Sequence, residues 1–152
     1  WRSGVRGGFR KELNCRAEDM VRALGPKTAN YVSLIYNPEP EELDAARRED
    51  GCILYEPEGI DQKNELDRVA AMMSALDAVV SVDTAVCPLA ASIGTPTIRL
   101  GWSHLYLGDG YDAVLGSCHP MASNVERFDM SVSLSRAAKA LPKILKVSSH
   151  GK

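Results

Sequence analysis

The chain has 152 residues, of which 45% are hydrophobic and 25% are charged, and its formal net charge is −2. This length suffices for one ordinary domain with a substantial core, and the composition is that of a soluble globular protein. The small net charge favours neither nucleic acid nor an anionic membrane as a partner. No apolar run approaches the length of a membrane span, and no signal peptide opens the chain.

The cysteines and the first residues indicate where the protein works and how much of it is present. The four cysteines form no C-x-x-C pair, which favours reduced thiols and a cytoplasmic location. The chain begins at Trp1 with a basic, Gly-rich stretch, WRSGVRGGFR, rather than with a strand or a helix. We therefore expect a fragment of a longer protein, cut just after a strand.

The first half of the chain alternates helical and extended patterns. Apolar residues recur at helical spacing over residues 12–24, and Gly25-Pro26 ends that helix. Residues 31–36 (YVSLIY) are typical of a strand, residues 40–50 of a charged surface helix, and residues 52–55 of the next strand.

The same alternation continues in the second half. Residues 65–76 form the clearest amphipathic helix, and a fully apolar strand follows over 78–82. A short apolar helix is predicted over 88–93 and a buried strand over 97–100. Residues 102–129 show no strong period. The last helix is predicted over 132–146, where Pro142 should kink or shorten it.

Apolar strands alternating with helices indicate a parallel sheet joined by right-handed crossovers. The prediction is an α/β protein: a Rossmann-like parallel sheet of about four to six strands with helices on both faces. Residues 1–152 are expected to form one such domain.

The strand over 78–82 ends at Asp83-Thr84, and a short helix follows. In an open parallel sheet, ligands bind where strands end and helices begin. The first amides of a helix lack partners inside it and attract anions, and Thr84 adds a hydroxyl. Two other interpretations stay open: Asp83 and Thr84 cap the helix, or Asp83 belongs to a receiver-like domain, although the additional acidic residues of that fold cannot be located.

Two further segments are candidates for the same site. Arg2 and Ser3 precede Gly4 in a loop where arginine could pair with a phosphate, or where the charges are simply solvated. Glu58 and Asp61 lie in the acidic loop after the strand at 52–55, and a carboxylate there could accept hydrogen bonds from a ribose. The alternative for that loop is a solvated acidic surface.

Other kinds of site are not supported by the sequence. The histidines do not stand at metal-ligand spacing with one another or with the cysteines. There is no P-loop, no G-x-G-x-x-G, no G-x-S-x-G elbow and no Asp-x-Asp pair. We expect neither a metal nor a bound cofactor. Cys87 is expected to pack as a small side chain. A flavodoxin-like redox domain is a further alternative for the whole chain.

The segment SALDAVVSVDTAVCPLAASIGTP, residues 74–96, resembles the nucleotide-sugar-binding motif of GT-B glycosyltransferases. The nearest groups are the bacterial tetratricopeptide-repeat glycosyltransferases, the heptosyltransferases and the O-GlcNAc transferases. WRSG, YVSLIYNPEPEEL and PEGIDQKNELD are similar to further segments of that family and occur in the same order, so the resemblance covers residues 1–101. It implies one half of a GT-B fold.

The resemblance implies a role for each candidate residue. Thr84, Ala85 and Val86 would meet the diphosphate of a nucleotide-sugar donor, and Asp83 would lie near the sugar. Arg2 and Ser3 would face the same phosphates. Glu58 and Asp61 would lie near the nucleoside.

The resemblance also implies the partners. The missing N-terminal domain of the same chain would supply the general base and bind a protein or glycan acceptor, so no catalytic residue is assigned here. Many of these relatives have a histidine where this chain has Pro88, which offers neither an imidazole nor an N–H. Pro88 favours the alternative of a degenerate, non-catalytic binding or scaffold module.

Overall fold

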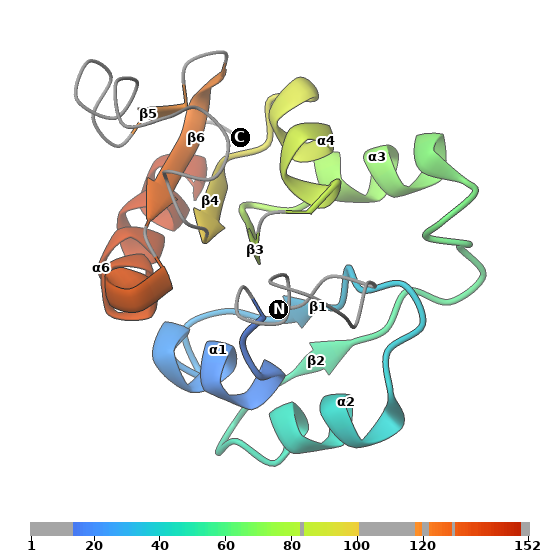
Figure 1. Cartoon of the computed structure of the whole chain (residues 1–152), viewed down its shortest axis with the longest axis vertical. Helices are drawn as coiled ribbons and strands as arrows, with labels where there is room; N and C mark the ends of the chain where they lie inside the picture. The colour runs from blue at the N-terminus through green and yellow to red at the C-terminus, as the bar shows by residue number, and fades with distance from the viewer. Residues whose placement is uncertain (1–13, 83, 101–117, 120–121, 129, 150–152) are drawn as a thin grey trace.

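The computed structural model describes residues 14–82, 84–100, 118–119, 122–128 and 130–149 (Figure 1). Helices and strands alternate along most of the chain, which confirms the α/β class. In chain order the elements are α1 (Ala17–Leu24), β1 (Tyr31–Val32), α2 (Pro40–Arg47), β2 (Leu54–Tyr55), α3 (Leu66–Ser74), β3 (Val79–Val82), α4 (Val86–Ser92), β4 (Thr97–Leu100), β5 (Cys118–His119), β6 (Ala122–Phe128) and α6 (Met130–Ser149).

The strands of the described residues form two separate sheets. In the smaller sheet β1 pairs with β2 in parallel. In the larger sheet the order is β3-β4-β6-β5, where β3, β4 and β6 are parallel and β5 is antiparallel to β6. The expected single parallel sheet of four to six strands is therefore not what the structure contains: no hydrogen bond joins β1 to β3, and one strand runs the other way.

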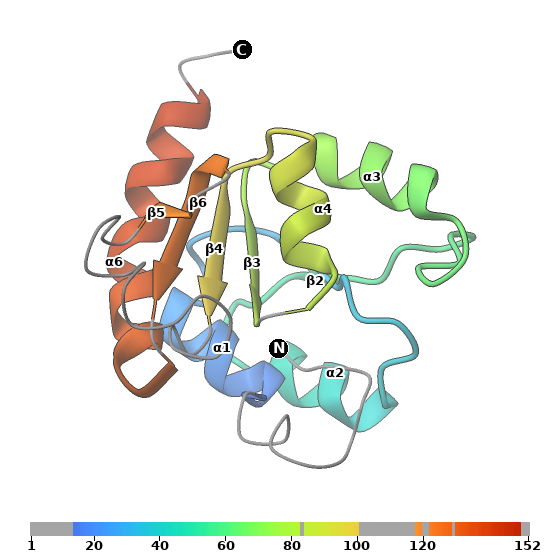
Figure 2. The same ribbon diagram turned by 45° about the horizontal axis from the view of Figure 1, so that its top comes forward.

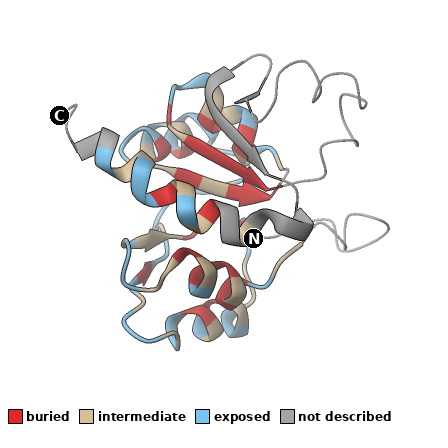
Figure 3. Ribbon diagram, turned by 90° about the vertical axis from the view of Figure 1, so that its left-hand side faces the viewer, coloured by how far each residue is buried: buried red, intermediate tan, exposed pale blue. Residues whose placement is uncertain are grey.

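Helices pack on both faces of the larger sheet, because its side chains alternate between two apolar clusters (Figure 2). Val82, Ile98 and Leu100 pack with α1 and α6, in the cluster that contains Met20, Leu24, Ala137 and Leu141. On the other face Val79 packs with Val69 and Met73 of α3 and Ala90 of α4. Figure 3 shows these buried residues in the central strands and on the inward faces of the helices.

Helix α1 joins the two sheets through its two apolar faces. Met20 and Leu24 belong to the cluster on the larger sheet. Ala17 and Val21 belong to a second cluster with Leu43 and Ala46 of α2 and with Leu54 of β2. The helix predicted over residues 12–24 is thus confirmed over 17–24. Its apolar residues form two stripes along the helix, one for each cluster, rather than one.

The end of α1 is set by Gly25, which has φ 94° and ψ 109°. Its N–H donates to the carbonyl oxygen of Val21 at 2.9 Å, and its own carbonyl accepts the phenol of Tyr31 at 2.8 Å. Burial raises the pKa of Tyr31 to about 12, so the phenol stays protonated and continues to donate. Gly25 therefore links the end of α1 to the start of β1.

Several predicted boundaries differ from the observed ones. Helix α6 continues through Pro142, which is exposed, so the carbonyl that loses its partner can meet water. Helix α4 begins at Val86, which places Pro88 within its first turn, where its missing N–H is tolerated. Strands β5 and β6 lie in the segment for which no period was detected. Among the described residues, no helix is long and apolar enough to cross a bilayer.

Candidate functional site

A cavity of about 940 Å³ lies between the two sheets, at the upper end of the size range of ligand pockets. Its wall includes Tyr31 and Val32 of β1, Leu54 of β2, and Val79 and Val80 of β3. We call it the inter-sheet cavity.

Residues that follow β1, β2 and β3 line part of this cavity. They come from the loop after β1, the loop between β2 and α3, and the turn between β3 and α4. We call this group the strand-end site: Tyr36, Gln62, Lys63, Thr84, Ala85 and Val86. The structure thus brings together three of the predicted residues at the location where ligands bind in open parallel sheets.

The turn after β3 offers hydrogen-bond donors. Ser81 Oγ donates to the carbonyl oxygen of Val82 at 2.8 Å and lies 3.3 Å from Thr84 Oγ1. Since the hydroxyl proton of Ser81 is already donated to Val82, the hydroxyl of Thr84 is the donor between the two side chains. A bound anion would compete with Ser81 for the proton of Thr84. Within the described residues, the amides of Ala85 and Val86 have no hydrogen-bond acceptor. Thr84 makes no side-chain cap on α4, so the structure does not support capping as its role.

The turn offers fewer donors than an ordinary helix start. The amide of Cys87 already donates to the carbonyl oxygen of Thr84 at 3.1 Å, and Pro88 has no N–H. Two amides and one hydroxyl are therefore available to an anion. The thiol of Cys87 is buried and contacts the carbonyl oxygens of Ser81 and Val82, at 3.7 and 3.5 Å, which confirms Cys87 as a packing residue.

A cation faces the site from the other sheet. Lys63 Nζ lies 5.5 Å from the centre of the Tyr36 ring, within the range of a cation–π contact. The neighbouring Gln62 donates through Nε2 to the carbonyl oxygen of Ser33 at 3.2 Å. In the part of the chain that the structure describes, Oε1 of Gln62 is buried without a hydrogen-bond partner, and so is Oγ of Ser33. Lys63, Gln62 and Tyr36 are absent from the prediction. Tyr36 ends the strand predicted over 31–36, and Gln62 and Lys63 follow the predicted acidic loop, so their positions in the sequence were a signal for the site.

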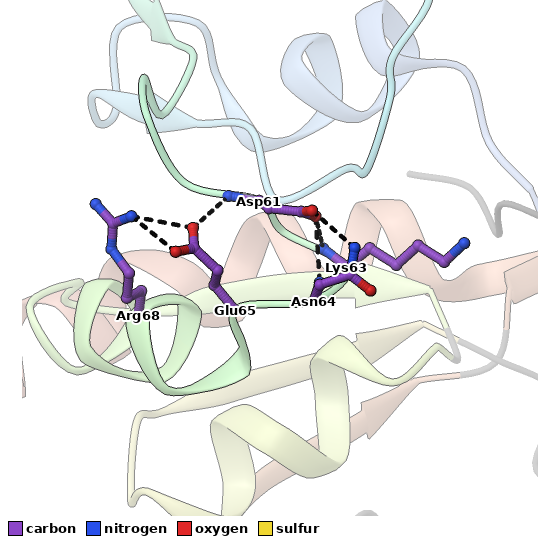
Figure 4. Close-up of polar contacts among 5 residues, drawn as sticks. All are labelled: Asp61, Lys63, Asn64, Glu65 and Arg68. Carbon is purple, nitrogen blue, oxygen red and sulfur yellow. Dashed lines mark hydrogen bonds and ion pairs between the residues drawn. The ribbon is translucent and has the colours of Figure 1, made fainter.

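Asp61 is engaged in a local network that starts α3 (Figure 4). Its Oδ1 accepts the amides of Lys63 and Asn64 at 2.9 and 3.2 Å, and its Oδ2 accepts Nδ2 of Asn64 at 2.7 Å. The amide of Asp61 donates to Glu65 Oε2 at 2.8 Å, and Glu65 also pairs with Arg68. The hydrogen bond from the Asn64 side chain is the first cause of a lowered Asp61 pKa.

Neither acidic candidate of this loop lines the cavity. Glu58 is exposed, beside Gly59, and Asp61 orders the turn that carries Gln62 and Lys63. The predicted contact of these carboxylates with a nucleoside stays a prediction. Arg2, Ser3 and Asp83 lie outside the described residues.

We expect Asp61→Ala to lower the melting temperature near neutral pH, because two amides at the start of α3 lose their acceptor. A carboxylate with a lowered folded pKa stabilises the fold above its unfolded value of 3.8, and this contribution disappears as the pH falls through the folded pKa. The difference in melting temperature should therefore shrink in acid. Thermal unfolding from pH 7 to pH 3 measures it, and Glu58→Ala, in the same loop, is the control. A difference that stays constant down to pH 3 would contradict this role.

Within the described residues, no three His, Cys, Asp or Glu side chains lie close enough together to hold a metal ion. Three cysteines, Cys15, Cys52 and Cys87, are free thiols. Burial raises the pKa of the thiols of Cys15 and Cys52.

Two comparisons relate the chain to known proteins. The chain is 39% identical over 79 residues to Protein FlbA of Caulobacter vibrioides, an alignment that covers 49% of this chain and 13% of that protein. The chain thus spans a small part of the length of this relative. No solved structure matches the chain. Residues 27–101, which contain the whole strand-end site, match the family model of glycosyltransferase family 9 (heptosyltransferase).

Proposed function

We propose that this chain is the donor-binding half of a GT-B glycosyltransferase. The whole protein would transfer a sugar from a nucleotide diphosphate sugar to an acceptor without a divalent metal. The observation that carries the proposal is that the segment similar to glycosyltransferase family 9 includes all six residues of the strand-end site. These residues come from three separate segments, and all of them line one cavity.

In this proposal the diphosphate lies against the turn after β3. The amides of Ala85 and Val86 and the hydroxyl of Thr84 donate to its oxygens, and Lys63 balances its charge from the opposite sheet. As the bond to the sugar breaks, negative charge grows on the leaving diphosphate, and the same groups stabilise it. The ring of Tyr36, which is 52% exposed, offers a flat surface to the base.

The remaining predicted residues keep the roles that the family resemblance implies. Arg2 and Ser3 would face the same phosphates, Asp83 would lie near the sugar, and Glu58 and Asp61 would lie near the nucleoside. The N-terminal half of the protein would bind the acceptor, a protein or a glycan, and would supply the general base. The free thiols fit a cytoplasmic enzyme. We expect this chain alone to bind a donor and to transfer no sugar.

A degenerate binding or scaffold module is the second candidate. Pro88 removes one amide from the first turn of α4, and Cys87 uses another within the turn. Such a module would keep the fold and hold no donor.

Isothermal titration with UDP, GDP and ADP separates the two proposals. For the donor-binding domain we expect saturable binding of one of them, which Thr84→Val weakens by about tenfold, since a hydrogen bond to a charged group contributes about 1.5 kcal/mol or more. Ser92→Ala is the matched control, because this variant removes a hydroxyl from the other end of α4, where it donates to the carbonyl oxygen of Leu89 at 2.8 Å.

A second variant tests the contribution of the opposite sheet to the same binding. Lys63→Met should also weaken binding and should make it less sensitive to salt, whereas Lys143→Met, at an exposed position of α6, should change neither. Absence of heat with all three nucleotides would favour the scaffold module. Binding that neither variant weakens would place the nucleotide elsewhere.

A further inference from the structure

One edge of β2 is turned away from β1. Among the described strands, β2 pairs with β1 alone. The carbonyl oxygens of Ile53 and Tyr55 face β1, because they accept the amides of Tyr31 and Ser33 at 2.8 and 2.9 Å. Successive carbonyls of a strand point to opposite edges, so that of Leu54 points away from β1. We call this side of β2 its outer edge.

The side chains of this segment favour pairing with a further strand. Ile53 and Tyr55 project to the same face of the sheet and are 50% and 54% exposed. Leu54 projects to the other face, where it packs with Leu43 and Ala46 of α2. On one face of a sheet, β-branched and aromatic side chains of neighbouring strands stabilise each other. Two copies of this chain joined at their outer edges would therefore bury exposed apolar surface, which is the usual hazard of an edge strand.

The side chain of Arg47 lies across the outer edge. Arg47 is the last residue of α2, and its Nε donates to the carbonyl oxygen of Leu54 at 3.4 Å. Its Nη2 donates to Oε1 of Glu56, directly after β2, at 2.6 Å. Its Nη1 lies 3.5 Å from Oδ1 of Asp44, one turn earlier in α2. All three nitrogens of the guanidinium are thus engaged, which holds the planar group in one orientation over the edge.

These contacts contribute little to the stability of the fold. The side chains of Arg47 and Glu56 are 38% and 46% exposed, and ion pairs at such exposure gain little over the hydrated ions. Their effect on pairing is larger. A further strand at this edge would need the carbonyl of Leu54 and the space that the guanidinium occupies, and it would remove a charge from water. Arg47 therefore opposes pairing more strongly than it stabilises the single chain.

We propose that Arg47 protects the outer edge of β2 from pairing with a second copy of this chain. Its guanidinium occupies the outward carbonyl of Leu54, and its charge makes the edge costly to bury. The exposed side chains of Ile53 and Tyr55 consequently do not lead to self-association. This inference rests on the contacts between α2 and β2, and it is independent of the proposed function.

Light scattering over a range of protein concentrations tests the proposal. We expect Arg47→Leu to self-associate with a dissociation constant at least about tenfold lower than that of the unsubstituted chain, since the same contact is released on both copies. Its melting temperature should stay close to that of the unsubstituted chain, because the lost ion pairs are exposed.

Arg48→Leu is the matched control, because it makes the same chemical change at the next residue, which is also exposed. We expect this variant to leave the association unchanged. The absence of a gain in Arg47→Leu would overturn the proposal. So would an equal gain in Arg48→Leu, because the added apolar surface alone would then account for it.

A lysine added to Arg47→Leu shows which surface joins the copies. Ile53→Lys places a charge beside the outer edge and should return the association to that of the unsubstituted chain. Ile93→Lys, which places a charge at the end of α4 on another exposed apolar residue, should leave the association of Arg47→Leu unchanged. Self-association that Ile53→Lys does not reduce would overturn the proposal, because a different surface would then hold the copies together.

Discussion

Replacing Ile98 with alanine is expected to lower the free energy of unfolding by about 2–5 kcal/mol. Ile98 lies in β4, between β3 and β6, and its side chain is fully buried. It packs with residues of α1, α6 and β3, and these elements are anchored elsewhere, so the space left by the smaller side chain cannot close completely. The loss therefore includes both the transfer of the removed groups and the cavity that remains. Urea denaturation followed by circular dichroism measures it.

Ile53→Ala is the matched control, because it makes the same chemical change at a side chain that is 50% exposed. We expect a loss of about 1 kcal/mol there, in proportion to the smaller area that is buried. Equal losses at the two positions would show that the larger sheet is not packed as described.

Gly25→Ala is expected to lower the free energy of unfolding by about 1–3 kcal/mol, measured in the same way. Gly25 has φ 94° and ψ 109°, a combination that residues with a Cβ rarely adopt. A Cβ at this position would also overlap Oγ1 of Thr28. Relief of this overlap would require the hydroxyl of Thr28, whose amide donates to the carbonyl oxygen of Gly25 at 2.9 Å, to turn away.

Gly59→Ala separates the backbone strain from the overlap. Gly59 also has a positive φ, 68°, but no atom lies within 4 Å of the position that a Cβ would occupy. We expect a loss of about 1 kcal/mol there, from the left-handed backbone alone. If Gly25→Ala costs no more than Gly59→Ala, the contact with Thr28 does not restrict this position.

The sequence predicted the elements whose patterns are local. The strand over 97–100 has the predicted boundaries, because it is a short segment between a Gly-Thr-Pro turn and Gly101. Residues 31–36 contain a shorter strand than predicted, since a strand needs a partner as well as a suitable composition, and Leu34 pairs with no strand of the described residues. The division into two sheets could not be predicted, because periodicity says nothing about which strands pair.

The site was predicted in part for a similar reason. Thr84, Ala85 and Val86 were found because they follow the most apolar strand of the chain. Lys63 was missed because a lysine in a polar loop is indistinguishable, by composition, from a solvated charge. Asp61 was predicted as a ligand from its position, and this stays a prediction; its observed hydrogen bonds are with residues of its own loop.

The two stripes of α1 have a consequence for how the protein unfolds. One helix contributes Met20 and Leu24 to one apolar cluster and Ala17 and Val21 to another, so neither cluster can dissolve while the other keeps α1 in place. The two halves are thereby expected to melt cooperatively, as a single calorimetric transition, although no strand pairing links them.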